Sequence, residues 1–373
     1  MDSPPLPSVK LRRLQVRNLR NIERANVELS TSINVFCGAN GQGKTSVLEA
    51  IYLIATSRSF RTHKLAEVIR HGATVASAHA WIDDAIGTRE QTVGIAPASR
   101  QVRVDGTKPP SMAQYALRTP VVVFHPGELV LTMGSASGRR TLLDRVALFF
   151  DSKSYAEQAA YTLAMKARNK LLQLGEPNAQ GLDAYELLMA QHGAALTRHR
   201  QDALDHLARA AQEAFEQVAP RSTRFATRYL PGGSFDEQEH AKQLHQRRTQ
   251  DARSHSATFG PHRDDMLIEI NGSPARTTAS QGQHRMLTLS LKIAEMVCIG
   301  RASGIPPLLL LDDVSSELDA DRTDAFFRLL GNRRDQVFLT TTRPEMVGVF
   351  EKAMGQAKVF SVRAGCTSEE PSR

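Results

Sequence analysis

Cysteine is scarce in this sequence, and the cysteines it has are far apart. Cys37, Cys298 and Cys366 form no CxxC pair, so we expect neither a metal cage of cysteines nor a disulfide framework. No apolar run reaches the roughly 18 residues that a membrane-spanning helix needs. The opening residues, MDSPPLPSVKLRR, lack the apolar stretch of a secretory signal. These absences argue against a secreted or membrane protein and predict a cytoplasmic location.

Acidic residues are in the minority, and the imbalance is concentrated near the N-terminus. The 373 residues carry a formal net charge of +8, and residues 1–125 hold 16 Lys and Arg against 9 Asp and Glu. A basic surface attracts polyanions, but a solvated basic face is an equally good interpretation of charge alone. With 41% hydrophobic residues, the chain is long enough for a sizeable core and more than one lobe.

Hydrophobic patterning predicts an α/β head that is split by a helical lobe. Alternating or short apolar runs predict strands, and apolar residues at helical spacing predict helices. Before residue 126 we expect a helix at 45–55 and strands at 11–17, 25–29, 33–37, 75–82, 90–95, 101–104 and 121–124. Residues 139–219 are mostly helical in pattern, with a break at 174–178. Later we expect helices at 283–299 and 322–330, and strands at 266–270, 307–311 and 337–341.

These changes of character divide the chain into three segments. Residues 1–125 are predicted to be the N-terminal part of the head, and residues 256–373 its C-terminal part. Residues 126–255 are predicted to be a mainly helical insertion, which ends in a Pro/Gly stretch and a polar, His- and Arg-rich segment.

The strongest chemical motif is a glycine-rich loop between the expected strand 33–37 and helix 45–55. It fits the P-loop pattern GxxxxGK[ST] through Gly38, Ala39, Asn40, Gly41, Gln42, Gly43, Lys44 and Thr45. The glycines let backbone N–H groups turn toward phosphate oxygens, and the helix N-terminus adds partial positive charge. Lys44 is expected to reach the β- and γ-phosphates of ATP, and the Thr45 hydroxyl to bind Mg²⁺. Chance would produce this pattern in about one chain in a hundred, and the flanking strand and helix favour nucleotide binding.

A second motif is an apolar strand that ends in two carboxylates, Asp312 and Asp313. This is the arrangement of a Walker B motif, which places carboxylates at the edge of an open sheet where ligands bind. We expect Asp312 to hold Mg²⁺ and Asp313 to orient or deprotonate the attacking water. A strand that ends in an ordinary polar turn is the alternative, and the upstream P-loop makes it the weaker one.

Two shorter segments each have two interpretations. Ser280, Gly282 and Gln283 open the long helix expected at 283–299, where they could form a second anion site or a simple helix cap. Residues 315–319 (SSELD) directly follow the carboxylate pair and could likewise cap the next helix. Taken alone, both segments favour the cap.

Together the four motifs stand in the order of ABC-type ATPase heads: Walker A, signature, Walker B and D-loop. In that class two heads enclose ATP, and the P-loop of one faces the signature serine of the other. More specifically, the chain resembles the RecF family of bacterial DNA replication and repair proteins over nearly its whole length. The segments that carry the resemblance are 11–23, 38–52, 58–61, 134–144 (GSASGRRTLLD), 258–265 (TFGPHRDD), 280–285 (SQGQHR) and 310–319 (LLDDVSSELD).

This resemblance implies a fold and a set of partners. The fold would be an ABC-type ATPase head, a mixed sheet with an antiparallel part, with an inserted mainly helical lobe. The cofactors would be ATP and Mg²⁺, and ATP would drive formation of a homodimer. The implied partners are double-stranded DNA next to single-stranded gaps, RecR, and RecA recombinase, which the family helps to load.

Several positions depart from the usual patterns. RecF proteins usually have Pro-Glu or Pro-Asp where Pro126-Gly127 stands, Pro where Ala136 stands, and an aromatic where Leu142 stands. Compared with most ABC ATPases, the chain has Asp313 in place of Glu, His125 in place of the Q-loop Gln, and residues 340–342 (TTT) in place of the switch His. These last departures predict slow hydrolysis, so that ATP acts as a switch.

Two functions remain in competition. The first is an ATP-driven clamp on DNA, with candidate phosphate contacts at Lys10, Arg12, Arg13, Arg17, Arg20, Arg139 and Arg140, any of which could instead be solvated or paired with a carboxylate. The second is the nucleotide-binding subunit of an ABC transporter. The lobe at 126–255, the missing Q-loop Gln and the RecF segments argue against the transporter.

Overall fold

A computed structural model describes residues 8–174, 179–220, 222–313 and 335–370. The chain divides into two compact units. The first unit joins Met1–Glu128 to Ile299–Arg373, and the second is Leu129–Cys298. No helix among the described residues has both the length and the apolar character to cross a membrane.

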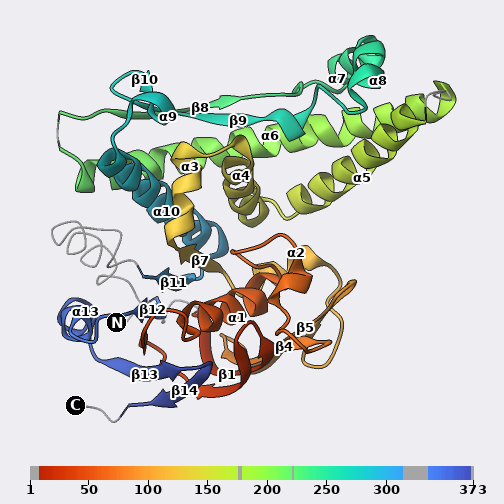
Figure 1. Ribbon diagram of the computed structural model, residues 1–373. Coiled ribbons are helices and arrows are strands. Elements are labelled where there is room, and N and C mark those ends of the chain that lie inside the picture. The colour runs from red at the N-terminus through yellow and green to blue at the C-terminus, as the bar shows by residue number, and fades with distance from the viewer. Residues whose placement is uncertain (1–7, 175–178, 221, 314–334, 371–373) are drawn as a thin grey trace. The chain divides into compact units, whose positions relative to one another are not determined.

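A mostly parallel sheet forms one layer of the first unit (Figure 1). Its strands are β3 (Ile33–Cys37), β7 (Val121–Phe124), β11 (Leu308–Asp312), β12 (Val337–Thr341), β13 (Ala357–Arg363) and β14 (Cys366–Glu369). Their order is β14-β13-β3-β12-β11-β7, and every neighbouring pair is parallel except β13 with β14. All residues of β3, β7, β11 and β12 are buried, as in strands covered on both faces. Their carboxyl ends therefore meet at one edge, where polar residues can gather.

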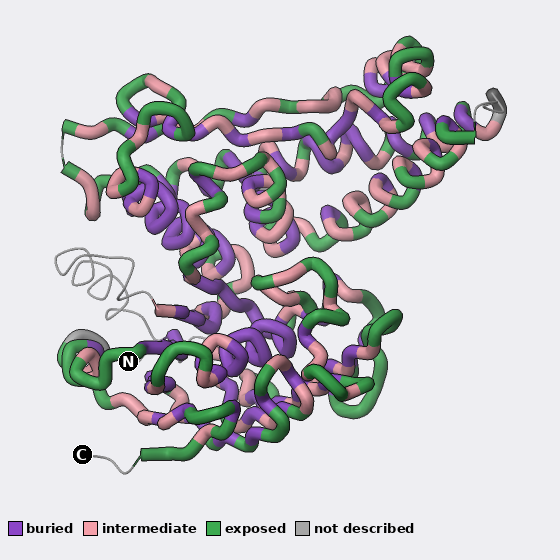
Figure 2. The backbone as a smooth tube through the Cα atoms, in the orientation of Figure 1, coloured by how far each residue is buried: buried purple, intermediate pink, exposed green. Residues whose placement is uncertain are grey.

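The second sheet of this unit is antiparallel. Its strands are β1 (Lys10–Leu19), β2 (Ile22–Glu28), β4 (Ala76–Asp83), β5 (Thr88–Ala96) and β6 (Ser99–Val104), in the order β2-β1-β4-β5-β6. Burial alternates along β4, along β5 and through the middle of β1, so one face is apolar and the other polar (Figure 2). Helix α1 (Lys44–Thr56) contacts strands of both sheets and lies in the core with them. Among its described residues, this unit also contains η1 (Leu65–Val68), α2 (Met112–Leu117), η2 (Pro126–Leu129), whose last residue falls in the second unit, and α13 (Met346–Met354).

The second unit combines helices with a small sheet. Its helices are α3 (Val130–Met133), α4 (Ala136–Phe150), α5 (Lys153–Gln173), α6 (Ala179–Val218), α7 (Glu237–Gln246), α8 (Arg248–Ser254), η3 (Pro261–Arg263), α9 (Ala275–Thr278) and α10 (Gln281–Ser303), whose last residues fall in the first unit. Its sheet pairs β8 (Phe225–Leu230), β9 (Asp265–Ile270) and β10 (Ser273–Pro274), in the order β10-β9-β8. One apolar cluster joins α4, α6, β9 and α10 through Leu143, Leu207, Ile268 and Leu291.

The segment GPHRDD, whose role the sequence left open, ties this unit together. Arg200 on α6 donates to Asp264 Oδ2 at 2.9 Å and to Asp144 Oδ1 at 2.7 Å. Tyr229 also donates to Asp264, a side chain with no exposed surface. Arg139 binds the next carboxylate, Asp265, through two hydrogen bonds of 2.6 and 2.9 Å. Because Arg139, Arg200 and Asp264 are buried and each has a charged partner, these hydrogen bonds tie the segment to helices α4 and α6.

The structure bears out most of the predicted elements. Strands β3, β7 and β12 have the predicted limits, and α4, α5 and α6 account for the helical pattern at 139–219. The lobe predicted at 126–255 and the compact unit 129–298 end at different residues, because β9 pairs with β8 and α10 packs in the core of that unit. The strands β8, β13 and β14 were not predicted. The helix predicted at 322–330 lies outside the described residues.

Candidate functional site

The glycine-rich loop 38–45 connects the buried strand β3 to helix α1 at the carboxyl edge of the parallel sheet. Gly41 has φ 77° and Gly43 has φ 112°, which side chains other than glycine rarely adopt. Gly43 is the N-cap of α1, and no side chain caps the helix or places an acid in its first turn. The free N–H groups at this helix start can therefore receive an anion, and phosphate fits their geometry.

Residues from remote parts of the chain hold the loop in shape. Asn21 donates to Gly41 O at 3.1 Å and accepts from Ser46 Oγ at 3.0 Å. The turn between β13 and β14 donates two backbone N–H groups to Gln42, to its side chain at 2.7 Å and to its carbonyl at 2.8 Å. A Cβ at Gly43 would lie 3.0 Å from the Asn21 side chain, so a larger residue would displace Asn21 in addition to straining the backbone at φ 112°.

Lys44 lies inside the curl of the loop. Its ammonium group donates to Gly38 O at 2.8 Å and to Ala39 O at 2.9 Å, and the residue is only 7% exposed. Burial lowers the pKa of Lys44, while the carboxylates of Asp313 and Asp312 act in the opposite direction. An ammonium group that has lost water on burial is stabilised by an anionic ligand, which replaces the lost water.

The candidate Mg²⁺ ligands lie side by side across the sheet edge. Thr45 Oγ1, at the start of α1, donates to Asp312, with distances of 2.9 and 3.0 Å to its two carboxylate oxygens. Asp312 is the last residue of β11, and the two residues are 267 positions apart in the sequence. A hydroxyl and a carboxylate are hard oxygen ligands of the kind that Mg²⁺ prefers. The chemistry of this donor pair therefore fits the ion, and both residues predicted to bind it meet here.

Thr340 joins the two carboxylate residues, a role that sequence reasoning missed. Its hydroxyl donates to Asp312 Oδ1 at 2.7 Å and accepts from the backbone N–H of Asp313 at 2.9 Å. Asp313 itself has φ 50°, which turns its backbone away from the line of β11. The sequence singled out Thr340 only as a position where a histidine is missing. The signal that could have found it is the parallel alignment of β12 with β11, which places Thr340 beside Asp312.

We expect Thr340→Val to lower the free energy of unfolding by about 1–3 kcal/mol, because the part-buried Asp313 N–H loses its hydroxyl acceptor and the buried Asp312 carboxylate loses one of its two hydroxyl donors. Chemical denaturation followed by the fluorescence of Trp81, which lies in the same unit, measures the change. Thr340→Ser keeps the hydroxyl and is the matched control. Equal stability of the Val and Ser variants would contradict the role assigned to this hydroxyl.

The predicted signature residues lie in the second unit and form a helix cap. Ser280 Oγ accepts from Gln283 N at 3.3 Å, and Gln283 Oε1 accepts from Ser280 N at 2.7 Å. This reciprocal pair is a capping box at the start of α10, so the cap interpretation is confirmed. Ser280 and Gln281 are exposed, and Gly282 is half-buried. The additional anion-binding role of Ser280, Gly282 and Gln283 stays a prediction, and the D-loop residues 315–319 lie outside the described part of the chain.

The structure sorts the basic residues that were predicted to contact DNA. Arg139 is only 4% exposed and donates to Asp265 and to two backbone carbonyls, so the structure shows the carboxylate pairing that was the alternative to a DNA contact. Arg20 forms a two-bond ion pair with the buried Glu49, and Arg12 pairs with Asp83. Arg17, by contrast, is exposed on the polar face of the antiparallel sheet.

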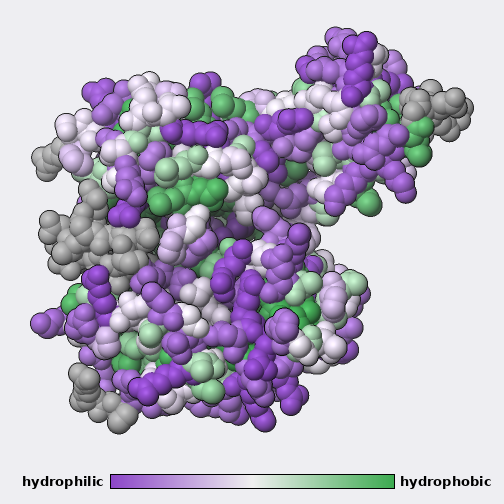
Figure 3. Space-filling view, in the orientation of Figure 1, coloured by the Kyte–Doolittle hydropathy of each residue, from purple (hydrophilic) through white to green (hydrophobic). Residues whose placement is uncertain are grey.

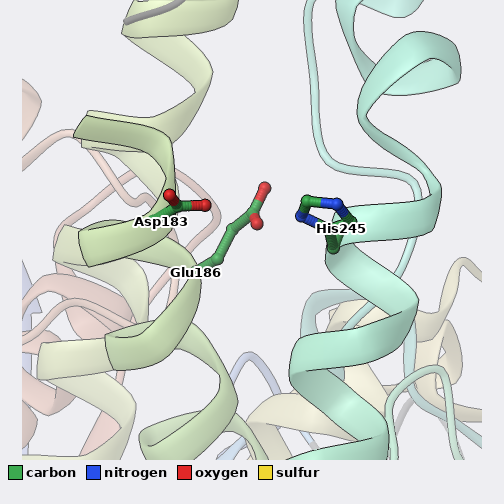
Figure 4. A group of neighbouring side chains, drawn as sticks. All are labelled: Asp183, Glu186 and His245. Carbon is green, nitrogen blue, oxygen red and sulfur yellow. The ribbon is translucent and has the colours of Figure 1, made fainter. Parts of the chain in front are cut away.

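A second group of possible metal ligands lies in the other unit (Figure 4). Single ligand atoms of Asp183, Glu186 and His245 all lie within 4.8 Å of one another. However, Arg248 donates to both carboxylates, and Arg168 donates to Glu186 Oε1 at 3.0 Å. The hydrogen bond to Glu186 raises the pKa of the Arg248 guanidinium. Because guanidinium groups already neutralise these carboxylates, we assign the group a structural role.

Comparisons with known proteins find similarity over nearly the whole chain. The model of the RecF/RecN/SMC N-terminal domain matches residues 10–368. The chain is 37% identical to the DNA replication and repair protein RecF of an Anaeromyxobacter species, over 96% of this chain and 99% of that protein. It is 35% identical to RecF of Myxococcus xanthus, over 91% and 92% of the two chains. It is also similar to a solved structure of the recombination mediator protein RecF with ATP in the RecFOR pathway, with a TM-score of 0.89, 26% identity and complete coverage of both chains.

Proposed function

The chain belongs to the RecF family of DNA replication and repair proteins, and on this premise we propose that it is an ATP-operated switch that binds DNA. The single observation that supports the proposal best is the convergence of Lys44, Thr45 and Asp312 at one sheet edge. A solved relative, described as RecF with ATP, has the same fold at a TM-score of 0.89.

ATP is proposed to bind along the loop 38–45. The free N–H groups of the loop and of the α1 N-terminus would bind the phosphate oxygens, and Lys44 would exchange its two carbonyl partners for the β- and γ-phosphates. Thr45 and Asp312 would hold Mg²⁺, which neutralises phosphate charge when it is bound. Thr340 would keep the Asp312 carboxylate in place while Thr45 turns from the carboxylate to the ion.

Hydrolysis is proposed to be slow. Asp313 would accept a proton from the attacking water, and its side chain is one methylene shorter than the glutamate of most ABC ATPases. His125 stands in place of the Q-loop Gln. Its ring packs against Phe60 at 5.1 Å between centroids, and its Nδ1 accepts from Gly127 N at 3.1 Å. These partners give His125 a role in packing the loop after β7. ATP binding would therefore set the state of the protein, and hydrolysis would reset it.

Two copies are proposed to close on ATP, each presenting the Ser280 end of α10 to the nucleotide of the other. The joined copies would then hold double-stranded DNA next to a single-stranded gap, cooperate with RecR and help load RecA, in the cytoplasm. Membership in the RecF family and the lack of a Q-loop Gln both argue against the transporter alternative.

Ser280→Arg tests the closed pair. We expect this variant to bind ATP normally, because Ser280 lies outside the loop 38–45 and caps α10. Its ATP-dependent dimerisation should weaken by about tenfold or more, since the cation would replace a small hydroxyl at a tight contact. Sedimentation velocity with and without ATP and Mg²⁺ measures this.

Gln191→Arg adds the same charge at an exposed site on α6 and is the matched control. A Ser280→Arg protein that dimerises as well as this control would refute the proposed pairing.

A further inference from the structure

We propose that the hairpin β13–β14 is a working part of the nucleotide site, because its turn orients backbone N–H groups of the loop 38–45 toward the phosphates. The inference rests on the proposed function in taking a triphosphate as the ligand of this loop. It adds a regulatory consequence. The affinity for ATP depends on the C-terminal hairpin, and bound ATP stabilises the hairpin in return, because coupling between two sites is reciprocal.

The turn of the hairpin is bonded to the loop at one residue, Gln42. Ala364 N donates to Gln42 Oε1 at 2.7 Å, and Gly365 N donates to Gln42 O at 2.8 Å. Both turn residues have positive φ, 49° for Ala364 and 79° for Gly365, as a two-residue type I′ turn requires. Alanine rarely adopts such a conformation, and strained backbone persists where the surrounding contacts hold it. The two hydrogen bonds to Gln42 are contacts of this kind.

Three segments of backbone meet beside the loop with no room for a side chain between them. A Cβ built on Gly365 would lie 2.3 Å from Asn21 O, in the turn between β1 and β2. A Cβ built on Gly38, the first residue of the loop, would lie 2.4 Å from Val362 O on β13. Strand β13 also pairs with β3, which leads into the loop. Because these segments are in direct backbone contact, a displacement of the hairpin is transmitted to the loop.

Hydrogen bonds from outside the loop determine where its own N–H groups point. A trans peptide is planar, so its C=O and N–H point in opposite directions. Asn21 Nδ2 donates to Gly41 O at 3.1 Å, and the N–H of Gln42 therefore points away from Asn21. Gly365 N donates to Gln42 O, and the N–H of Gly43 therefore points away from the hairpin. Because Asn21 and Gly365 are in contact, both N–H groups point away from the same side of the loop.

Two consecutive N–H groups on one side of a loop form a site for a phosphate oxygen. In the part of the chain that the structure describes, neither the N–H of Gln42 nor that of Gly43 has an acceptor. Lys44 follows directly, with its ammonium group inside the curl of the loop. Gln42 is therefore a positioning residue, because its side chain binds the hairpin while its backbone N–H faces the ligand. The hairpin sets the direction of the dipoles that receive the triphosphate.

The hairpin faces solvent on its outer side. In the described sheet, β14 is an edge strand, and Cys366, Ser368 and Glu369 on it are exposed. Figure 3 shows hydrophilic side chains at the lower edge of the first unit, where Figure 1 places β14. A contact or a substitution on this edge can therefore change the phosphate-binding N–H groups through one turn, without entering the nucleotide site.

Hydrogen exchange of the full-length protein, followed by mass spectrometry, tests the link with and without nucleotide. Without nucleotide, Gln42→Ala should speed exchange at the turn 364–365 about threefold to tenfold, because one turn N–H loses its acceptor. Gln42→Glu keeps an oxygen acceptor and should restore the slow exchange. In the unaltered protein, ATP with Mg²⁺ should slow exchange at this turn about threefold or more. The turn 97–98 between β5 and β6 is the internal control and should not respond.

Equilibrium binding of a fluorescent ATP analogue tests the effect on affinity. Gly365→Ala places a Cβ against Asn21 O, so the turn must move away from the loop, and affinity should fall about tenfold or more. Gly106→Ala is the matched control, since Gly106 has nearly the same φ, 73°, and nothing lies within 4 Å of its Cβ. Gln42→Ala, which brings no clash, should lower the affinity about threefold to tenfold. Equal ATP affinity of the two glycine variants, or unaltered affinity in Gln42→Ala, would overturn the proposal.

The two measurements separate this proposal from the proposed function. If ATP does not bind, but Gln42→Ala still speeds exchange at the hairpin turn, the proposed function is wrong and the contact between hairpin and loop is supported. If ATP binds the unaltered protein without slowing exchange at the turn, the proposed function stands and the coupling proposed here is wrong.

Discussion

Lys44→Ala should reduce the affinity for ATP by about 30- to 5,000-fold, which corresponds to about 2–5 kcal/mol. The reason is that the variant removes a buried cation whose hydrogen atoms now point at Gly38 O and Ala39 O, inside the curl that phosphate would occupy. Equilibrium binding of a fluorescent ATP analogue, in the presence of Mg²⁺, measures the loss. ATP-dependent dimerisation should disappear with it at ordinary nucleotide concentrations.

Asn40→Ala provides the control for this loop. Asn40 is exposed, and the loop is proposed to bind phosphate through backbone N–H groups at that position, so its side chain can be removed without loss of affinity. Unchanged ATP affinity in Lys44→Ala would show that the nucleotide, if it binds at all, binds elsewhere. Equal losses in both variants would indicate a general distortion of the loop.

Asp313→Asn should lower the rate of ATP hydrolysis about 10²- to 10⁴-fold while ATP binding is retained. Asparagine keeps the size of the side chain and the backbone hydrogen bond to Thr340, but it cannot accept a proton from water. Because hydrolysis is proposed to open the pair, the variant should remain dimeric after ATP is diluted. Single-turnover hydrolysis and sedimentation after dilution measure the two effects.

Asp313→Glu is the matched comparison for this carboxylate. It restores a proton acceptor and adds the methylene that most ABC ATPases have, so we expect hydrolysis at least as fast as in the unaltered chain. Full hydrolysis by Asp313→Asn would mean that another group positions the attacking water. If Asp313→Asn hydrolyses ATP as fast as the unaltered chain while Asp313→Glu hydrolyses it more slowly, Asp313 does not accept the proton.

Much of the head could be predicted from the sequence, because its signals are local. Strand β3, the loop 38–45 and helix α1 are contiguous, so the buried run, the glycines and the helical spacing together define the site in one stretch of chain. The carboxylates at the end of β11 were readable for the same reason. Strands β8, β13 and β14 escaped prediction because burial alternates weakly along them, and β8 and β14 also lie at sheet edges.

The sequence by itself determined where the glycine-rich loop 38–45 turns between β3 and α1, where the carboxylates follow the apolar run of β11, and where helices replace strands. Each of these depends on backbone freedom and hydrophobic spacing among neighbouring residues. The tertiary structure alone decided that Thr340 bridges Asp312 and Asp313, that Arg139 is buried on Asp265 instead of free for DNA, and that Arg17 and Arg24 face each other across two strands. The physical reason is that hydrogen bonds and charge pairs depend on distances between atoms, and residues remote in sequence acquire those distances only when the sheets and helices pack.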